Sequence, residues 1–136
     1  MSWLLDTNVL SELRKGQNAN GRVRNWASRT VGEQHFISVL SLGEIRKGIE
    51  LLRKKSPPQC VAFERWLSQL HSDYSDSILP VSEEISERWG RLMAIRTLPV
   101  IDGLIAATAI THGLTIVTRN AADFKLPAVK AINPFE

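Results

Sequence analysis

Several features are scarce in this chain, and each scarcity excludes a class of protein. Cys60 is the only cysteine among the 136 residues, so a disulfide scaffold is excluded, and a lone thiol is typical of a reducing cytoplasm. No run of about 18 apolar residues occurs, and the first residues lack the basic start and long apolar stretch of a signal peptide. The sequence therefore predicts a cytoplasmic protein without a membrane segment.

What is present fits one globular domain. Hydrophobic residues make up 43% and charged residues 23% of the sequence, which excludes the disordered, collagenous and coiled-coil classes. No internal repeat, low-complexity tract or long linker divides the chain, and we expect residues 1–136 to form a single domain. A net charge of +3 is only weak support for a polyanionic partner.

Short apolar runs alternate with longer stretches of helical periodicity. The runs, which we interpret as strands, cover residues 3–5, 35–40, 78–81, 114–118 and 129–132. Pro80 places the third run at a sheet edge or strand end, and residues 18–21 are expected to form only a loop. Between the runs, apolar residues recur at helical spacing, and residues 102–111 are apolar on nearly every side, which predicts a buried helix. Alternating strands and helices predict an α/β fold whose parallel sheet is covered on both faces.

Four acidic residues fall at positions that such a fold could bring together. Asp6 directly follows the first strand, and Glu44 and Asp123 each lie within about six residues of the end of a later strand. Asp102 opens the buried helix. In an open α/β sheet the carboxyl ends of the strands meet at one crevice, where ligands bind. We therefore expect these acids, which are distant in sequence, to share one site.

Each acid also has a purely structural interpretation, which the residue pattern leaves open. Ser41 and Glu44 have the spacing of a capping box, and Asp102 could be the N-cap of the buried helix. Asp6 could cap a strand-to-helix turn, and Asp123 could be an ordinary turn residue. Capping does not explain why all four acids should gather at one edge of a sheet.

Four carboxylates in one place would repel one another, and divalent cations would remove that conflict. Hard cations such as Mg²⁺ and Mn²⁺ prefer oxygen ligands, and Mg²⁺ is held by a few carboxylates together with water and substrate phosphate. The sequence has no Cys/His set suited to zinc. The histidines, which we expect to be structural or surface residues, are His35, His71 and His112.

The charge outside the four acids favours a phosphate-containing substrate. Without these acids, ten acidic residues face 17 basic ones. A basic surface around a metal-neutralised site suits a polyanionic backbone, whose binding is mostly electrostatic. Arg46, near Glu44, and Arg119, near Asp123, are candidate substrate-binding residues, although each could equally belong to an ordinary solvated surface.

Four sequence motifs, taken in order, resemble those of one known family. They read LLDTNVLSEL, SVLSLGEIRKGIE, LPVIDGLIAATAITHGLTIVTRNAADF and INPFE. Together they resemble the PIN-domain ribonucleases, and most closely the VapC/FitB-type toxins of prokaryotic type II toxin–antitoxin pairs. The resemblance covers essentially the whole chain, and four motifs in the right order are far more specific than any one of them.

The resemblance implies a three-layer α/β/α fold with a mainly parallel sheet of about five strands. It implies RNA cleavage dependent on Mg²⁺ or Mn²⁺, a homodimer, and a cognate antitoxin through which alone the protein would meet DNA. The family's four acids are matched by Asp6, Glu44, Asp102 and Asp123. The polar residues that orient this corner in the family are matched by Asn8, Thr118 and Asn120.

In this interpretation Asp6 and Asp102 are the principal metal ligands, and metal-activated water attacks the phosphodiester. Glu44 and Asp123 complete the site.

Two rival hypotheses stay open. Asp6 could be the nucleophile of an aspartyl-phosphate phosphotransferase, although haloacid-dehalogenase-like enzymes have a second Asp where this chain has Asn8. Alternatively, the chain could be a non-catalytic RNA-binding module that needs no metal.

Overall fold

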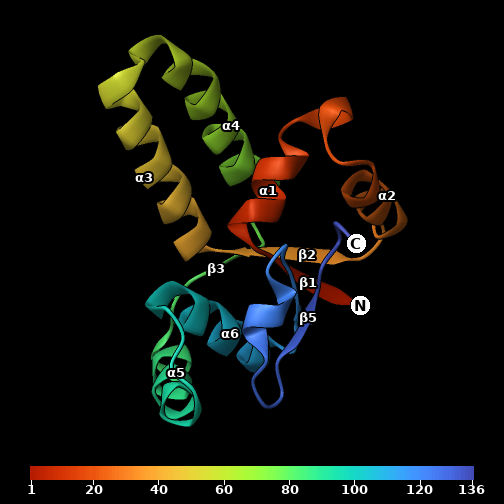
Figure 1. The fold of residues 1–136 in the computed structure, drawn as a ribbon, viewed down its shortest axis with the longest axis vertical. Helices are drawn as coiled ribbons and strands as arrows, with labels where there is room; N and C mark the ends of the chain where they lie inside the picture. Colours follow the sequence, from red (N-terminus) through yellow and green to blue (C-terminus); the bar gives the residue numbers. More distant parts are fainter.

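A five-stranded, fully parallel sheet forms the centre of the molecule (Figure 1). The computed structural model describes all residues from 1 to 136. The strands lie in the order β3-β2-β1-β4-β5. Their bounds are β1 (Ser2–Leu5), β2 (Gln34–Ser38), β3 (Ile78–Leu79), β4 (Thr115–Val117) and β5 (Lys130–Ile132). This sheet confirms the predicted α/β class, and each strand lies within two residues of its expected bounds.

Six helices surround the sheet, and two of them have no counterpart in the sequence prediction. The helices are α1 (Thr7–Leu13), α2 (Gly21–Arg29), α3 (Val39–Lys55), α4 (Cys60–Asp73), α5 (Glu83–Ile95) and α6 (Val100–His112). The two additional helices, α1 and α2, are short. The loop expected over residues 18–21 in fact leads into α2, because Asn20 is the N-cap of this helix, and its side chain accepts hydrogen bonds from the backbone N–H groups of Arg22 and Val23.

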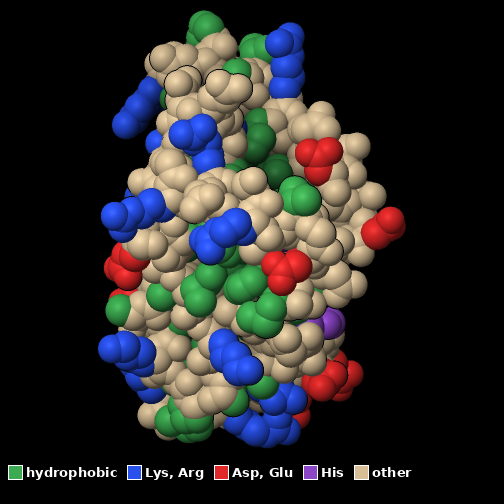
Figure 2. All heavy atoms as spheres, turned by 90° about the vertical axis from the view of Figure 1, so that its right-hand side faces the viewer, with side chains coloured by type: hydrophobic (Ala, Val, Ile, Leu, Met, Phe, Trp, Pro, Cys, Tyr) green, Lys and Arg blue, Asp and Glu red, His purple; other side chains and the backbone are tan.

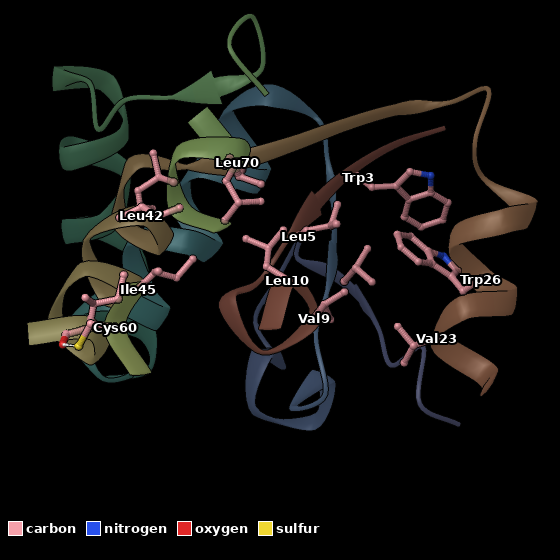
Figure 3. Packing of buried hydrophobic residues seen from close by; sticks show 14 residues of the cluster. Trp3, Leu5, Val9, Leu10, Val23, Trp26, Leu42, Ile45, Cys60 and Leu70 are labelled. Atoms are coloured by element: carbon pink, nitrogen blue, oxygen red, sulfur yellow. Dashed lines mark hydrogen bonds between the residues drawn. The ribbon is translucent and has the colours of Figure 1, made fainter. Parts of the chain in front are cut away.

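Each face of the sheet is covered by its own hydrophobic core, which confirms the three-layer arrangement. Trp3 and Leu5 of β1 point into a core shared with α1, α2, α3 and α4 (Figure 3). Leu4, between them, points to the opposite face and packs with residues of α5 and α6, such as Ile105. Because a parallel sheet is buried on both faces, its strands are apolar at consecutive positions rather than at alternate ones.

The buried helix expected over residues 102–111 is α6, which begins two residues earlier. Its buried residues include Gly103, Ile105 and the stretch from Ala106 to Ala109, and Gly113 ends it in the left-handed conformation with φ of 66°. In the whole chain, no single helix has both the length and the apolar character needed to cross a membrane. Only α5 and α6 taken together, bent by 116° at their junction, pass that test by length and composition.

Gly103 lets α6 approach α5 closely, directly beside Asp102. A Cβ atom at this position would lie 2.8 Å from Met93 Sδ and 2.9 Å from Trp89 Nε1. We expect Gly103→Ala to overpack this contact and lower the free energy of unfolding by about 1–3 kcal/mol, as measured by thermal or urea denaturation. Gly90→Ala on α5 is the matched control, because a Cβ there meets nothing within 4 Å, and it should leave stability unchanged or raise it. Equal stability of the two variants would contradict the close-packing argument.

Candidate active site at the carboxyl edge of the sheet

Asp6 lies where β1 ends and α1 begins, and its side chain is held by two hydrogen bonds. Its backbone N–H donates to Val117 O at 2.9 Å, which keeps the end of β1 against β4. Its Oδ1 accepts from the backbone N–H of Thr7, as an N-cap does, and its Oδ2 accepts from Thr118 Oγ1, each at 2.9 Å. Only 8% of Asp6 is exposed. The capping interpretation of Asp6 is therefore correct, but Oδ2 also faces β4.

The Thr118 hydroxyl joins the three polar residues that the family resemblance singled out. It donates to Asp6 and accepts from Asn8 Nδ2 at 3.2 Å and from the backbone N–H of Asn120 at 3.1 Å. Asn8 Oδ1 in turn accepts from the backbone N–H of Arg119 at 3.1 Å. Thr118 is completely buried, so this network fixes the end of β4 against the start of α1.

Glu44 reaches the same corner from α3. Its Oε1 accepts a hydrogen bond of 2.6 Å from Thr7 Oγ1, and Thr7 is the residue next to Asp6. The capping-box interpretation of Ser41 and Glu44 is wrong, because α3 begins at Val39 and its N-cap is Ser38, whose hydroxyl accepts from Leu40 N. Glu44 therefore lies in the second turn rather than the first, and its carboxylate does not cap the helix.

Asp102 is likewise free of any capping role. Helix α6 begins at Val100 after Pro99, so Asp102 is the third residue of the helix and the expected N-cap assignment is wrong. Burial raises the pKa of the Asp102 carboxyl above its usual range, and the negative charges of Asp6, Glu44 and Asp123 raise it further, in that order. The three other acids therefore lie near enough to Asp102 for their charges to act on its carboxyl group.

Asp123 is the most exposed member of this acid cluster, which we define as Asp6, Glu44, Asp102 and Asp123. It lies in a short 3₁₀ turn, Ala121–Phe124, and its backbone N–H donates to Asn120 O at 2.9 Å. The turn interpretation of Asp123 is thus correct for its backbone, and its charge still acts on Asp102.

No Lys or Arg side chain forms an ion pair with the acid cluster. The eight ion pairs of the protein all involve other acids. Arg46, a candidate substrate-binding residue, instead donates to Glu50 and Glu64, at 3.0 and 2.6 Å. The Arg119 guanidinium lies 4.0 Å from the centroid of the Phe135 ring and 3.7 Å from Glu12. The negative charge of the cluster is therefore not compensated within the chain.

The donor atoms of the acid cluster suit a hard divalent cation. All of its side chains offer carboxylate oxygens, and no thiol or imidazole belongs to the cluster, which favours Mg²⁺ or Mn²⁺ over zinc. Nowhere in the chain do three or more His, Cys, Asp or Glu side chains already stand in an arrangement that could hold a metal ion. The donor chemistry of the cluster fits a hard cation, although its carboxylates are not already arranged as a ligand set.

Two features of this corner were missed by the sequence analysis. Thr7 carries the hydrogen bond that fixes Glu44, and nothing in the sequence pairs two residues so far apart. A largely apolar groove of about 360 Å³ also begins at Thr7 and Glu44 and continues between α3 and α4 to Phe63 and Trp66. Both arise from contacts between elements, which periodicity within one element does not reveal.

Comparison with known proteins places the chain among relatives of closely similar length. The sequence model of the PIN domain matches residues 3–129. The chain is 32% identical to Toxin FitB of Neisseria gonorrhoeae, covering 97% of each protein, and 28% identical to VapC ribonuclease Y4jK of Sinorhizobium fredii, covering 98% and 97%. It superposes on the crystal structure of FitAcB from Neisseria gonorrhoeae with a TM-score of 0.85 at 30% identity, covering 98% of this chain and 99% of that one. A structure of FitAB bound to an IR36 DNA fragment gives a TM-score of 0.83 at 29% identity, covering 98% and 96%.

Proposed function

The chain belongs to the PIN-domain family, and from this premise we propose that it is a metal-dependent ribonuclease and the toxin of a type II toxin–antitoxin pair. The observation that carries the proposal is the acid cluster: its four carboxylates have no basic partner, and the pKa of Asp102 is raised by burial and by the charges of the other three. Relatives that match nearly the full chain are named toxin FitB and VapC ribonuclease, which supports the same conclusion.

The residues of the acid cluster have distinct parts in the proposed reaction. A bound Mg²⁺ or Mn²⁺ would polarise the scissile phosphate and make a water molecule nucleophilic near neutral pH. Asp6 and Asp102, from β1 and α6, would be the principal ligands, and Glu44 and Asp123 would complete the site. Thr118 orients Asp6, and Thr7 orients Glu44.

No histidine is placed to remove a proton at this site. His35 lies at the start of β2, away from the carboxyl end of the strand, and contacts Thr30 Oγ1 and Glu33 O, each at 2.9 Å. His71 and His112 are exposed, at the ends of α4 and α6. No histidine is therefore assigned as general base; a cation held by the acid cluster would lower the pKa of the attacking water, and the proton of that water would pass to solvent.

The two rival hypotheses account for less of the structure. An aspartyl-phosphate mechanism has no use for Glu44 and Asp123 beside Asp6, and Asn8 uses both ends of its amide to hold Thr118 and Arg119. A non-catalytic RNA-binding module would gain nothing from four uncompensated carboxylates beside an anionic ligand, because they would repel it.

The proposed partners follow from the relatives and from the proposed role as a toxin. Solved relatives include FitAB bound to DNA and a VapBC2 complex from Rickettsia felis bound to a promoter fragment. We propose RNA as the substrate, a cognate antitoxin as the inhibitor, a homodimer as the assembly and the cytoplasm as the location. Contact with DNA would then occur only through the antitoxin.

The proposal is tested by digestion of RNA with the purified protein. Cleavage is expected with Mg²⁺ or Mn²⁺ and should disappear in EDTA, because an uncompensated acid cluster without a cation repels the phosphate. Calorimetric titration with Mn²⁺ should show binding by the same preparation. RNA cleavage that is equally fast in EDTA, or RNA binding without any metal binding, would refute the proposed function.

A further inference from the structure

Outside the acid cluster, one pocket has two arginines and two asparagines among its walls. It has a volume of about 330 Å³ and lies between α2 and the segment that follows β5. We call it the α2 pocket, and its walls include Arg22, Asn25, Trp26, Arg29, Asn133 and Glu136. Its size falls at the lower end of the range found for small-ligand sites.

The two arginines of the α2 pocket are positioned by their helix and are not neutralised. Arg22, Asn25, Trp26 and Arg29 follow the spacing i, i+3, i+4 and i+7, so they share one face of α2. Trp26 anchors this face, because it is only 5% exposed and packs edge-on against Trp3 with ring centroids 5.6 Å apart. Neither arginine guanidinium makes an ion pair or a hydrogen bond within the protein, in contrast to Arg46.

Basic side chains are widespread on this side of the molecule. Figure 2 shows Lys and Arg over much of the face that carries α2 and the two ends of the chain, while most Asp and Glu side chains in view lie toward one side. Glu136 is the single acidic residue among the walls of the α2 pocket, and it is exposed. Counted by side chains, the walls of the α2 pocket therefore carry two positive charges and one negative charge.

One wall of the α2 pocket lies at the same edge of the sheet as the acid cluster. Asn133 follows Ile132, and Ile132 pairs with Val117 of β4. The Nδ2 group of Asn133 donates a hydrogen bond to Arg119 O at 2.9 Å. Arg119 in turn donates its backbone N–H to Asn8 in the network around Asp6. Strands β1, β4 and β5 are consecutive in the sheet, so the ends of β1 and β5 are separated by two strand spacings, about 10 Å.

We propose that the α2 pocket binds a backbone phosphate of the RNA substrate. This phosphate neighbours, in the same strand, the phosphodiester that is cleaved at the acid cluster. This inference rests on the proposed ribonuclease function. Guanidinium groups bind phosphate through paired hydrogen bonds, and Asn25 adds a neutral amide donor, whereas the amide of Asn133 is already bonded to Arg119 O and Phe135 N. Because the acid cluster itself repels the RNA backbone until it holds cations, positive charge beside it is needed to hold the rest of the strand.

The test compares the wild type with the double variant Arg22→Gln/Arg29→Gln. Binding of a fluorescent single-stranded RNA oligonucleotide is measured by anisotropy in EDTA over a series of KCl concentrations, and cleavage kinetics are measured in Mg²⁺. We expect the variant to bind RNA at least about tenfold more weakly. The slope of the logarithm of the binding constant against the logarithm of the KCl concentration should become shallower by about 0.7 for each phosphate that the protein no longer binds. KM should rise while kcat changes little, because the arginines hold the RNA equally well before and during the reaction.

The matched control is Arg65→Gln/Arg91→Gln, which removes the same charge from exposed positions on α4 and α5. If Arg22→Gln/Arg29→Gln binds and cleaves RNA like this control, the proposed role of the α2 pocket is wrong and the proposed ribonuclease function still stands. A wild-type protein that neither binds nor cleaves RNA overturns both. Glu136→Gln provides a change of opposite sign: tighter RNA binding supports the α2 pocket, and unchanged or weaker binding contradicts it.

Discussion

Replacing Asp6 with Asn is expected to reduce metal-dependent RNA cleavage by at least about 100-fold while the fold survives. The amide keeps an oxygen that can accept from Thr7 N, so the cap of α1 is preserved, and its size matches the carboxyl group. What disappears is one negative charge at the most buried position of the acid cluster, together with the hydrogen bond that Thr118 Oγ1 donates to Oδ2. Even residues that only support metal ligands typically contribute 10–100-fold, so removal of a principal ligand should exceed that range. Cleavage rates of a defined RNA at saturating Mn²⁺ measure the effect.

The control for Asp6→Asn is the same chemical change at an unrelated acid. Asp76 is exposed between α4 and β3 and has no ion pair or side-chain hydrogen bond, so Asp76→Asn should cleave RNA like the wild type. Circular dichroism and thermal unfolding should show that both variants are folded. A folded Asp6→Asn protein that cleaves RNA at the wild-type rate would remove Asp6 from the site and leave the proposed mechanism without its central ligand.

The strands and the longer helices were predictable because their signals lie within single segments. Ile45, Ile49 and Leu52 repeat on one face of α3. The apolar run over residues 114–118 contains β4 and extends one residue beyond it at each end. The short helices α1 and α2 have little such repetition, and they are held instead by contacts that come from elsewhere, as Trp26 is by Trp3. The start of α3 could not be predicted for a related reason: Ser38 and Ser41 are equally good caps in sequence, and the structure uses Ser38.

The acid cluster was predictable from strand ends, but its internal connections were not. The expected meeting of Asp6, Glu44 and Asp123 follows from their positions after parallel strands, whereas Asp102 precedes β4 and joins them only because α6 packs under the sheet beside α5. The bond from Thr7 to Glu44 spans two elements. The free arginines of the α2 pocket could not be separated by sequence from Arg46, whose charge is engaged by Glu50 and Glu64.

Replacing Asp102 with Asn is expected to stabilise the metal-free protein at pH 7, in contrast to most substitutions at a partly buried position. The pKa of Asp102 is raised in the fold by burial and by the three other acids, so its ionised form destabilises the native state at neutral pH. As pH falls through this raised pKa, the carboxyl group takes up a proton and the penalty disappears. The stability difference between variant and wild type in EDTA should therefore be largest near pH 7 and shrink toward pH 4.

With divalent cations present, the wild type should become more stable than Asp102→Asn. A cation that binds only the native wild type at 100 times its Kd adds about 2.7 kcal/mol of stability, and Asp102→Asn should lose most of this gain together with RNA cleavage. For a chain of this size, 1 kcal/mol corresponds to a shift in Tm of about 2–4 °C, so unfolding scans in EDTA and in Mn²⁺ resolve both effects. If Asp102→Asn lowers Tm in EDTA and leaves the response of Tm to Mn²⁺ unchanged, Asp102 stabilises α6 and is not part of a cation-binding site.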